Sequence, residues 1–372
     1  MNLFSFYYKS VYRNRINYLP IVILLMIPLF ILYFNSLTNS LLSSVQQEID
    51  SSEHLLLSAQ NVEQTNALEQ QINENIDFLE AYNKGEFSEA YVIRRDKLSR
   101  IKDLDLLSGQ STKESQDVLN RLILEFDALS KINVEFDSQY GSIHGFNHTL
   151  FTVMNQIIPI IFTAIIALFA SELFTLNYHE GVDIERTYPI KQATIQLIKT
   201  ASLCVVSIVL YFLFIVINFA TSSVLFGRGS LDYPLIGFTQ DSLELTTYTL
   251  KDIILPGFAL QILSIILIVC LAILLAKWVH NKLHLFFLLI AIIYFQSIII
   301  EHVPIFWKIV HFFPLYYLNV VDVLSFSGTQ QMGNMFINKQ NGILILLLHI
   351  SIVVVFLYLY NSYNFKRKKK NE

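Results

Sequence analysis

The sequence ELFTLNYHEGVDIERTYPIKQATIQLIK, residues 172–199, is a short polar interval between two long apolar runs. A helix needs about 20 apolar residues to cross a hydrocarbon core of about 30 Å. The runs on both sides of the interval meet this length, so the interval reads as a loop joining two membrane spans. The rest of the chain is span, outer loop or flank around it.

The composition indicates a membrane protein before any motif is considered. Of the 372 residues, 53% are hydrophobic and 15% are charged, and the mean hydropathy is +0.49. A soluble globular protein carries about 25% charged residues. The two cysteines, Cys204 and Cys270, both lie in apolar runs, so we expect neither a disulfide framework nor a cysteine-based metal site.

Six apolar stretches predict an all-α polytopic membrane protein with six transmembrane helices. The first stretch lacks a small-residue cleavage site, which indicates a retained anchor. The predicted segments are 1–17 (N-terminal interfacial helix), 18–37 (first span), 38–148 (extracellular helical domain), 149–170 (second span), 171–200 (cytoplasmic loop), 201–225 (third span), 226–253 (extracellular loop), 254–276 (fourth span), 277–283 (cytoplasmic loop), 284–301 (fifth span), 302–341 (extracellular loop with short interfacial helices), 342–361 (sixth span) and 362–372 (basic tail).

The distribution of cations predicts that both termini are cytoplasmic. An even number of spans places the two ends on one side, and short cytoplasmic segments collect Lys and Arg. With the ends inside, the short inner segments hold 13 cations and the two short outer loops hold four. A cationic tail that follows a span directly is read as a membrane-orienting flank, so we expect lipid contact and no nucleic acid there.

The long segment between the first two spans is acidic and amphipathic. Residues 38–147 contain 19 acidic and nine basic side chains. Apolar residues recur every three to four positions from Leu42 to Leu79 and again from Val118 to Phe136. Gly85 and the turn at residues 107–109 interrupt this pattern. We therefore expect two long, coiled-coil-like helices around a shorter middle one, the first continuing directly from the first span.

The sequence lacks the motifs of an enzyme. It has no phosphate-binding loop of the type G-x-x-x-x-G-K-[ST], so the chain is not expected to hydrolyse ATP. His179-Glu180 begins like a zinc-protease helix, but Asp183 stands where the second histidine is required. No G-x-S-x-G nucleophile elbow occurs. Glu172, at a span end, is expected to be a solvated carboxylate. We expect no catalytic, metal or cofactor-binding residues.

The polar loop itself has an ordered pattern. Gly181 permits a chain reversal, and Pro189 suits the first position of a helix. The apolar residues that follow predict a short helix lying along the membrane. Charged groups suited to docking surround it, and the candidate site is Glu180, Gly181, Asp183, Glu185, Arg186, Pro189, Lys191 and Lys199.

This pattern resembles the first cytoplasmic loop of ABC-2-type permeases, the membrane subunits of many ABC exporters. The matching residues are the pair Glu180-Gly181, then Pro189 with Lys191 nearby, then Lys199 opening the next span. The resemblance implies six spans, a docking site for a separate ATPase subunit that binds the ATP, and a second permease chain, identical or paralogous. The long insert between the first two spans marks a subgroup with a large extracellular domain.

Two functions follow as hypotheses. The first is the permease subunit of an ABC transporter in a bacterial plasma membrane, exporting an amphipathic peptide, drug or lipid. The alternative is a membrane receptor or sensor whose helical extracellular domain binds a ligand or a partner.

Overall fold

The computed structural model describes residues 6–7, 18–38, 41–58, 61–108, 112–139, 141–176, 178–179, 182–183 and 190–371. The chain is about 80% helical and divides into two compact units. We call the first the spanning unit; it comprises Met1–Phe30, Thr149–Ala220 and Ile254–Glu372. The second, the hairpin unit, comprises Ile31–His148 and Thr221–Ile253.

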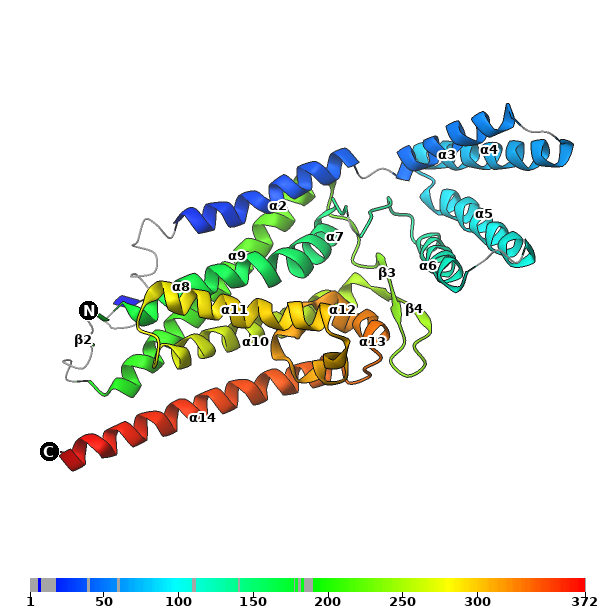
Figure 1. The fold of residues 1–372 in the computed structure, drawn as a ribbon. Helices are drawn as coiled ribbons and strands as arrows, with labels where there is room; N and C mark the ends of the chain where they lie inside the picture. Colours follow the sequence, from blue (N-terminus) through cyan, green and yellow to red (C-terminus); the bar gives the residue numbers. More distant parts are fainter. Residues whose placement is uncertain are drawn as a thin grey trace. The chain divides into compact units, whose positions relative to one another are not determined.

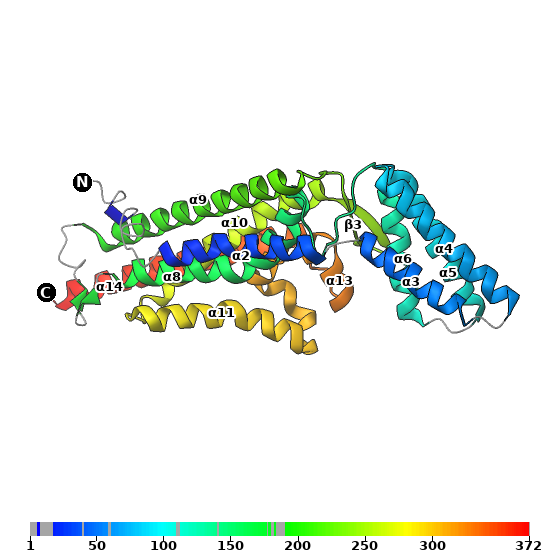
Figure 2. The ribbon, with the colours of Figure 1, turned by 90° about the horizontal axis from the view of Figure 1, so that it is seen from above.

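Among the described residues, six helices are long and apolar enough to cross a membrane. They are Tyr18–Thr38 (α2), Gly145–Thr175 (α7, η2 and α8 in succession), Gln192–Phe226 (α9), Leu250–Leu275 (α10), Lys282–His302 (α11) and Lys339–Asn371 (α14). Figures 1 and 2 show α8, α9, α10, α11 and α14 running alongside one another. This is the architecture of a helical, multi-pass membrane protein, the class that the composition predicts.

The third of these helices differs from the prediction at its start. α9 begins at Gln192, so residues 192–199 form its first turns and the expected separate helix along the membrane is wrong. No Gly or Pro interrupts this stretch, and Ile195 is completely buried. Continuous backbone hydrogen bonding with one buried face therefore favours a single long helix.

The second of these helices contains a π-helical segment. η2 spans His148–Phe162 and continues as α8 over Thr163–Thr175. Pro159 lies inside η2 and has no N–H to donate. In i→i−5 pairing its acceptor would be the carbonyl of Met154. That carbonyl accepts instead from Gln261 Nε2 on α10, at 2.6 Å.

Gln261 ties three parts of the spanning unit together. Its Nε2 also donates to the carbonyl of Leu318, at 3.2 Å, and its Oε1 accepts from the hydroxyl of Tyr211 on α9, at 2.8 Å. The side chain is fully buried. Both amide hydrogens and the carbonyl oxygen are thus satisfied, as burial of an amide requires.

Short helices fill the segment between α11 and α14, as the sequence predicts. They are η4 (Pro304–Phe312), η5 (Pro314–Leu318), α12 (Val320–Leu324) and α13 (Ser327–Met332). Side chains of the long helices cap them: Asn155 Oδ1 accepts from the amide of Val321, and Gln296 Oε1 accepts from the amide of Leu315. These bonds anchor the short helices to η2 and α11.

The hairpin unit contains a meander of four helices. They are Leu41–Leu56 (α3), Val62–Asn83 (α4), Phe87–Ser108 (α5) and Lys113–Leu129 (α6), and each packs against the next. Asn61 and Thr112 cap α4 and α6 by accepting from Gln64 N and Ser115 N. Gly85, at φ +80°, makes the turn between α4 and α5. The expected arrangement of two long helices around a shorter one is wrong, because the chain also turns before Asn61.

A β-hairpin completes this unit and was not predicted. β3 (Pro234–Phe238) pairs antiparallel with β4 (Leu245–Thr249), with Pro234 opposite Thr249. Both strands pack against α6, where the guanidinium of Arg121 lies 5.0 Å from the centre of the Phe238 ring. The all-α class therefore holds for most of the chain, with this hairpin as an addition.

The segment that follows α6 is fixed by Asp137. Its carboxylate accepts from the amides of Ile143 and His144, at 2.8 and 3.0 Å. The hydroxyl of Tyr233 donates to the backbone carbonyl of Asp137, at 2.8 Å. Asp137 and Tyr233 are both buried, so this irregular backbone is hydrogen-bonded within the hairpin unit.

Candidate functional site

The polar loop between α8 and α9 is described only in part. β1 (Tyr178–His179) pairs antiparallel with β2 (Val182–Asp183), with His179 opposite Val182. Asp183 is thus placed by its backbone alone. Glu180, Gly181, Glu185, Arg186 and Pro189 lie outside the described residues. The structure therefore bears on the predicted site mainly through its flanks.

Lys199 is the best-defined member of the predicted site. It lies within α9 rather than opening a span at its first turn, and only 2% of it is exposed. Its Nζ is 5.1 Å from the centre of the ring of Tyr7, which is 1% exposed. A desolvated ammonium over an aromatic face gains about 2 kcal/mol. Lys199 therefore holds the N-terminal residue Tyr7 against the start of α9.

Lys191 is placed differently. It precedes α9, is exposed, and its carbonyl accepts from the amides of Thr194 and Ile195. Its backbone thus begins the hydrogen-bonding ladder of the helix. Lys191 and Lys199 are not brought together: one charge is exposed before α9 and the other is buried within it.

An ion pair that the sequence analysis missed lies on the other flank of the loop. Glu172, near the end of α8, is 3.1 Å from Nζ of Lys282, at the start of α11. The Glu172 side chain is 14% exposed, so the expected solvated carboxylate is wrong. A carboxylate at a helix C-terminus and an ammonium at a helix N-terminus each interact unfavourably with the dipole of their own helix. The ion pair offsets both unfavourable interactions and joins α8 to α11.

Aromatic residues gather at the end of α10. The ring of Trp278 lies 6.1 Å from Phe356 and 6.2 Å from Tyr360, both on α14. The Nζ of Lys277 is 6.0 Å from the centre of the Tyr360 ring. Trp and Tyr beside Lys are typical of the membrane–water boundary. The sequence shows that a cation, Lys277, follows the fourth span, but only the structure shows that it lies beside α14.

These contacts share one end of the spanning unit, which we call the loop end. It comprises the end of α8, the starts of α9 and α11 and the end of α10. Figure 1 shows α8 ending, and α9 and α11 beginning, on this side. The loop end thus carries three lysines, Lys199, Lys277 and Lys282, each beside an aromatic ring or a carboxylate.

No group of three or more His, Cys, Asp or Glu side chains among the described residues is placed to hold a metal ion. Cys204 and Cys270 are both free thiols. What the loop end can do chemically is present charge and an anchored backbone to another molecule. Comparisons with protein families, curated proteins and solved structures found no match to this chain.

Proposed function

We propose that this chain is the permease subunit of an ABC exporter in a plasma membrane. Two such chains form the path, and separate ATPase subunits dock beneath residues 172–199. ATP is bound and hydrolysed by those subunits. The low charge of the spans suits an amphipathic peptide, drug or lipid as cargo. In this arrangement the loop end is cytoplasmic, and the hairpin unit is extracellular.

The observation that carries the proposal is the anchoring of both flanks of the polar loop. On one flank, Glu172 ties α8 to α11 through Lys282, at 3.1 Å. On the other, Lys199 ties α9 to Tyr7, at 5.1 Å. A force applied to the loop therefore reaches four chain segments through these two contacts, of which the one between Lys199 and Tyr7 is buried.

The charges of the loop suit docking on a soluble partner. Glu180, Asp183 and Glu185 precede Arg186 and Lys191 within 12 residues. Mixed charges of this kind steer association and fix the register of an interface more than they raise its affinity. The same residues match the pattern of ABC-2-type permeases, which supports the assignment of the partner.

The test is co-purification with an ATPase. A tagged full-length chain, extracted from its native membranes in detergent, is expected to bring down a protein with a Walker-type phosphate loop. The double variant Glu180→Ala, Gly181→Val is expected to lower that recovery about tenfold, equivalent to about 1.4 kcal/mol of binding. The matched control is Asp241→Ala, an exposed position in the β-hairpin.

Membrane insertion and yield of the double variant are expected to equal those of the control. Unchanged ATPase recovery from the double variant contradicts the role given to the loop. Absence of any such ATPase from the unsubstituted chain contradicts the permease function itself. In that case the receptor or sensor function is favoured, since the hairpin unit holds the polar cleft described below.

A further inference from the structure

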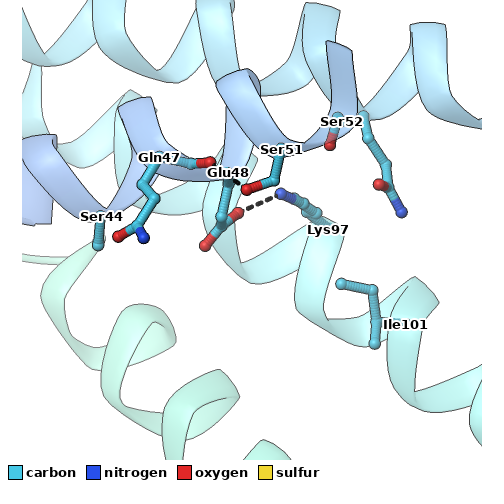
Figure 3. Close-up of a pocket in the computed structure, with 8 residues that line it drawn as sticks. Ser44, Gln47, Glu48, Ser51, Ser52, Lys97 and Ile101 are labelled. Carbon is cyan, nitrogen blue, oxygen red and sulfur yellow. Dashed lines mark hydrogen bonds and ion pairs between the residues drawn. The ribbon is translucent and has the colours of Figure 1, made fainter. Parts of the chain in front are cut away.

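A polar cleft lies between α3, α4 and α5 of the hairpin unit, and it plays no part in the proposed transport function. Its volume is about 480 Å³, within the range of about 300–1,000 Å³ typical of small-molecule sites. Seven of its eight lining side chains are polar. Figure 3 shows α3 supplying one wall through Ser44, Gln47 and Ser51, with Lys97 of α5 facing them.

An ionic cluster with excess positive charge adjoins the cleft: Glu48 and Lys97 line it, whereas Arg94 does not. Arg94 donates to both carboxylate oxygens of Glu48, at 2.5 and 2.8 Å, and Lys97 donates to one of them, at 2.7 Å. Burial alone raises the pKa of Glu48, but the hydrogen bonds from Arg94 and Lys97 lower it to about 2. Two cations thus share one carboxylate, and the cluster carries one net positive charge.

This cluster has more hydrogen-bond donors than acceptors. The ammonium of Lys97 has three donors, and it donates to Glu48 and to Asn75, the latter at 2.8 Å. Because Asn75 Oδ1 accepts from Lys97, Nδ2 of Asn75 must be a donor. That atom and Arg94 Nε are buried and have no partner among the described residues, but neither residue lines the cleft.

Buried donors without acceptors are rare in folded proteins, because each costs free energy until an acceptor is supplied. In this cluster Asn75 and Arg94 supply such donors outside the lining of the cleft, so the cationic group open to a ligand is the ammonium of Lys97, beside a lining of hydroxyls and amides. A cation is disfavoured by the charge, and an acyl chain is disfavoured by the polar lining. Phosphate is disfavoured as well, because the Arg94 fork that would bind it is already occupied by Glu48.

We propose that this cleft binds a polar ligand that carries a carboxylate and has the size of a short peptide. The carboxylate lies next to Lys97, where it offsets the net positive charge. The hydroxyls and amides of Ser44, Gln47, Ser51, Ser52 and Gln71 provide both donors and acceptors for peptide groups. Ile101 is the one apolar contact in the lining.

The experiment uses the full-length chain in detergent and two matched probes. The first probe is N-acetyl-trialanine with a free carboxylate, and the second is the same peptide amidated at its C-terminus. Binding is measured by ligand-observed NMR titration. The acid is expected to bind with a Kd of about 1 mM or lower, and the amide about tenfold more weakly. Inorganic phosphate serves as a third probe.

Two exposed glutamines of α3 give a matched pair of variants. Gln47 lines the cleft, whereas Gln46 points elsewhere and bonds to Asp50 at 3.0 Å. Gln47→Trp is expected to fill the cleft and abolish binding of the acid, while Gln46→Trp leaves it unchanged. Lys97→Met is expected to remove the preference for acid over amide, with unfolding measured alongside because Lys97 is buried.

Several outcomes overturn the proposal. They are equal binding of acid and amide, no saturable binding of the acid up to about 10 mM, and retention of binding by Gln47→Trp. Tighter binding of phosphate than of the acid overturns the assignment of a carboxylate. The result is independent of the permease assignment, because ATPase recovery is expected to be the same in Gln47→Trp and Gln46→Trp.

Discussion

The two units of this protein stabilise buried polar groups by different means. In the interior of the spanning unit the groups are neutral: Gln261 bonds to two carbonyls and a hydroxyl, and Asn218 Nδ2 donates to the carbonyl of Phe214, at 2.7 Å. The hairpin unit also buries charged groups, as in the cluster of Glu48, Arg94 and Lys97, where Lys97 is buried.

The difference follows from the cost of placing a charge far from water. A neutral amide in hydrocarbon needs only hydrogen-bond partners, whereas a charge there costs several kcal/mol even when it is paired. The spanning unit accordingly places Lys199, Glu172 and Lys282 near helix ends. The hairpin unit uses ion pairs throughout its helices, which fits a surface in contact with water.

The largest expected effect is on the neutral network. Gln261→Leu leaves the carbonyls of Met154 and Leu318 and the hydroxyl of Tyr211 without their partner. Three lost hydrogen bonds at about 1 kcal/mol each predict a loss of about 3 kcal/mol in the free energy of unfolding. The measurement is denaturant unfolding in detergent micelles.

The control for this change lies in η2, the π-helical segment that Gln261 contacts through Met154. Gln156 is exposed, so Gln156→Leu is expected to alter the free energy of unfolding by less than about 0.5 kcal/mol. Equal effects of the two substitutions contradict the role given to Gln261.

A pH titration separates the two units. The imidazole ring of His144 lies close to two carboxylates: its Nδ1 is 3.1 Å from Asp137 Oδ2 and its Nε2 is 3.4 Å from Glu135 Oε2. Burial lowers the pKa of His144, but these carboxylates raise it to about 9. Because the folded-state pKa is above the unfolded value of 6.5, the stabilisation is complete below pH 6.5. It is lost as the pH rises through 9.

We expect the hairpin unit to lose about 1–2 kcal/mol of stability between pH 6.5 and 10, after allowance for solvent screening at Glu135. His144→Gln is expected to remove this dependence. The measurement is hydrogen exchange of the hairpin unit in the full-length chain as a function of pH. If the stability of the hairpin unit still depends on pH in His144→Gln, the effect belongs to another titrating group.

The smallest effect concerns a helix cap. Asn61→Ala removes the acceptor for the amide of Gln64, at 2.7 Å, and is expected to cost about 1 kcal/mol. Asn61→Asp retains the acceptor and is expected to leave stability within about 0.3 kcal/mol. Thermal unfolding monitored by circular dichroism compares the two variants; equal losses would show that the cap contributes nothing.

The six long helices could be predicted because hydropathy accumulates over about 20 residues and tolerates local exceptions. The start of α9 at Gln192 could not, because Gln192, Thr194, Gln196 and Lys199 lower the hydropathy of a helix that nevertheless continues. The π-helical hydrogen bonding of η2 could not be predicted either, although Pro159 marks a place where the regular backbone hydrogen bonding has to change.

The hairpin unit was harder to predict because short signals decide its turns. Gly85 was identified correctly as a break, but Asn61 was overlooked as an N-cap. That omission merged α3 and α4 into one helix. The β-hairpin has β-branched residues at Thr246, Thr247 and Thr249, which favour a strand. Their polarity led instead to the prediction of a loop.

The candidate site was only partly accessible to sequence reasoning. The order of Glu180, Gly181 and Pro189 can be read from the chain and remains a prediction. The partner of Glu172 is Lys282, which is 110 residues away, and the ring over Lys199 comes from Tyr7. Contacts between residues so far apart in the chain depend on how the helices pack, and helix packing cannot be deduced from a single sequence.

The length of α9 has a mechanical consequence. Its 35 residues extend about 52 Å at 1.5 Å per residue, whereas a bilayer core is about 30 Å thick. The turns from Gln192 to Lys199 are therefore continuous with the span rather than jointed to it. Because one helix runs from Gln192 to Phe226, we expect a displacement of its first turn to be passed along α9 and not absorbed at a joint.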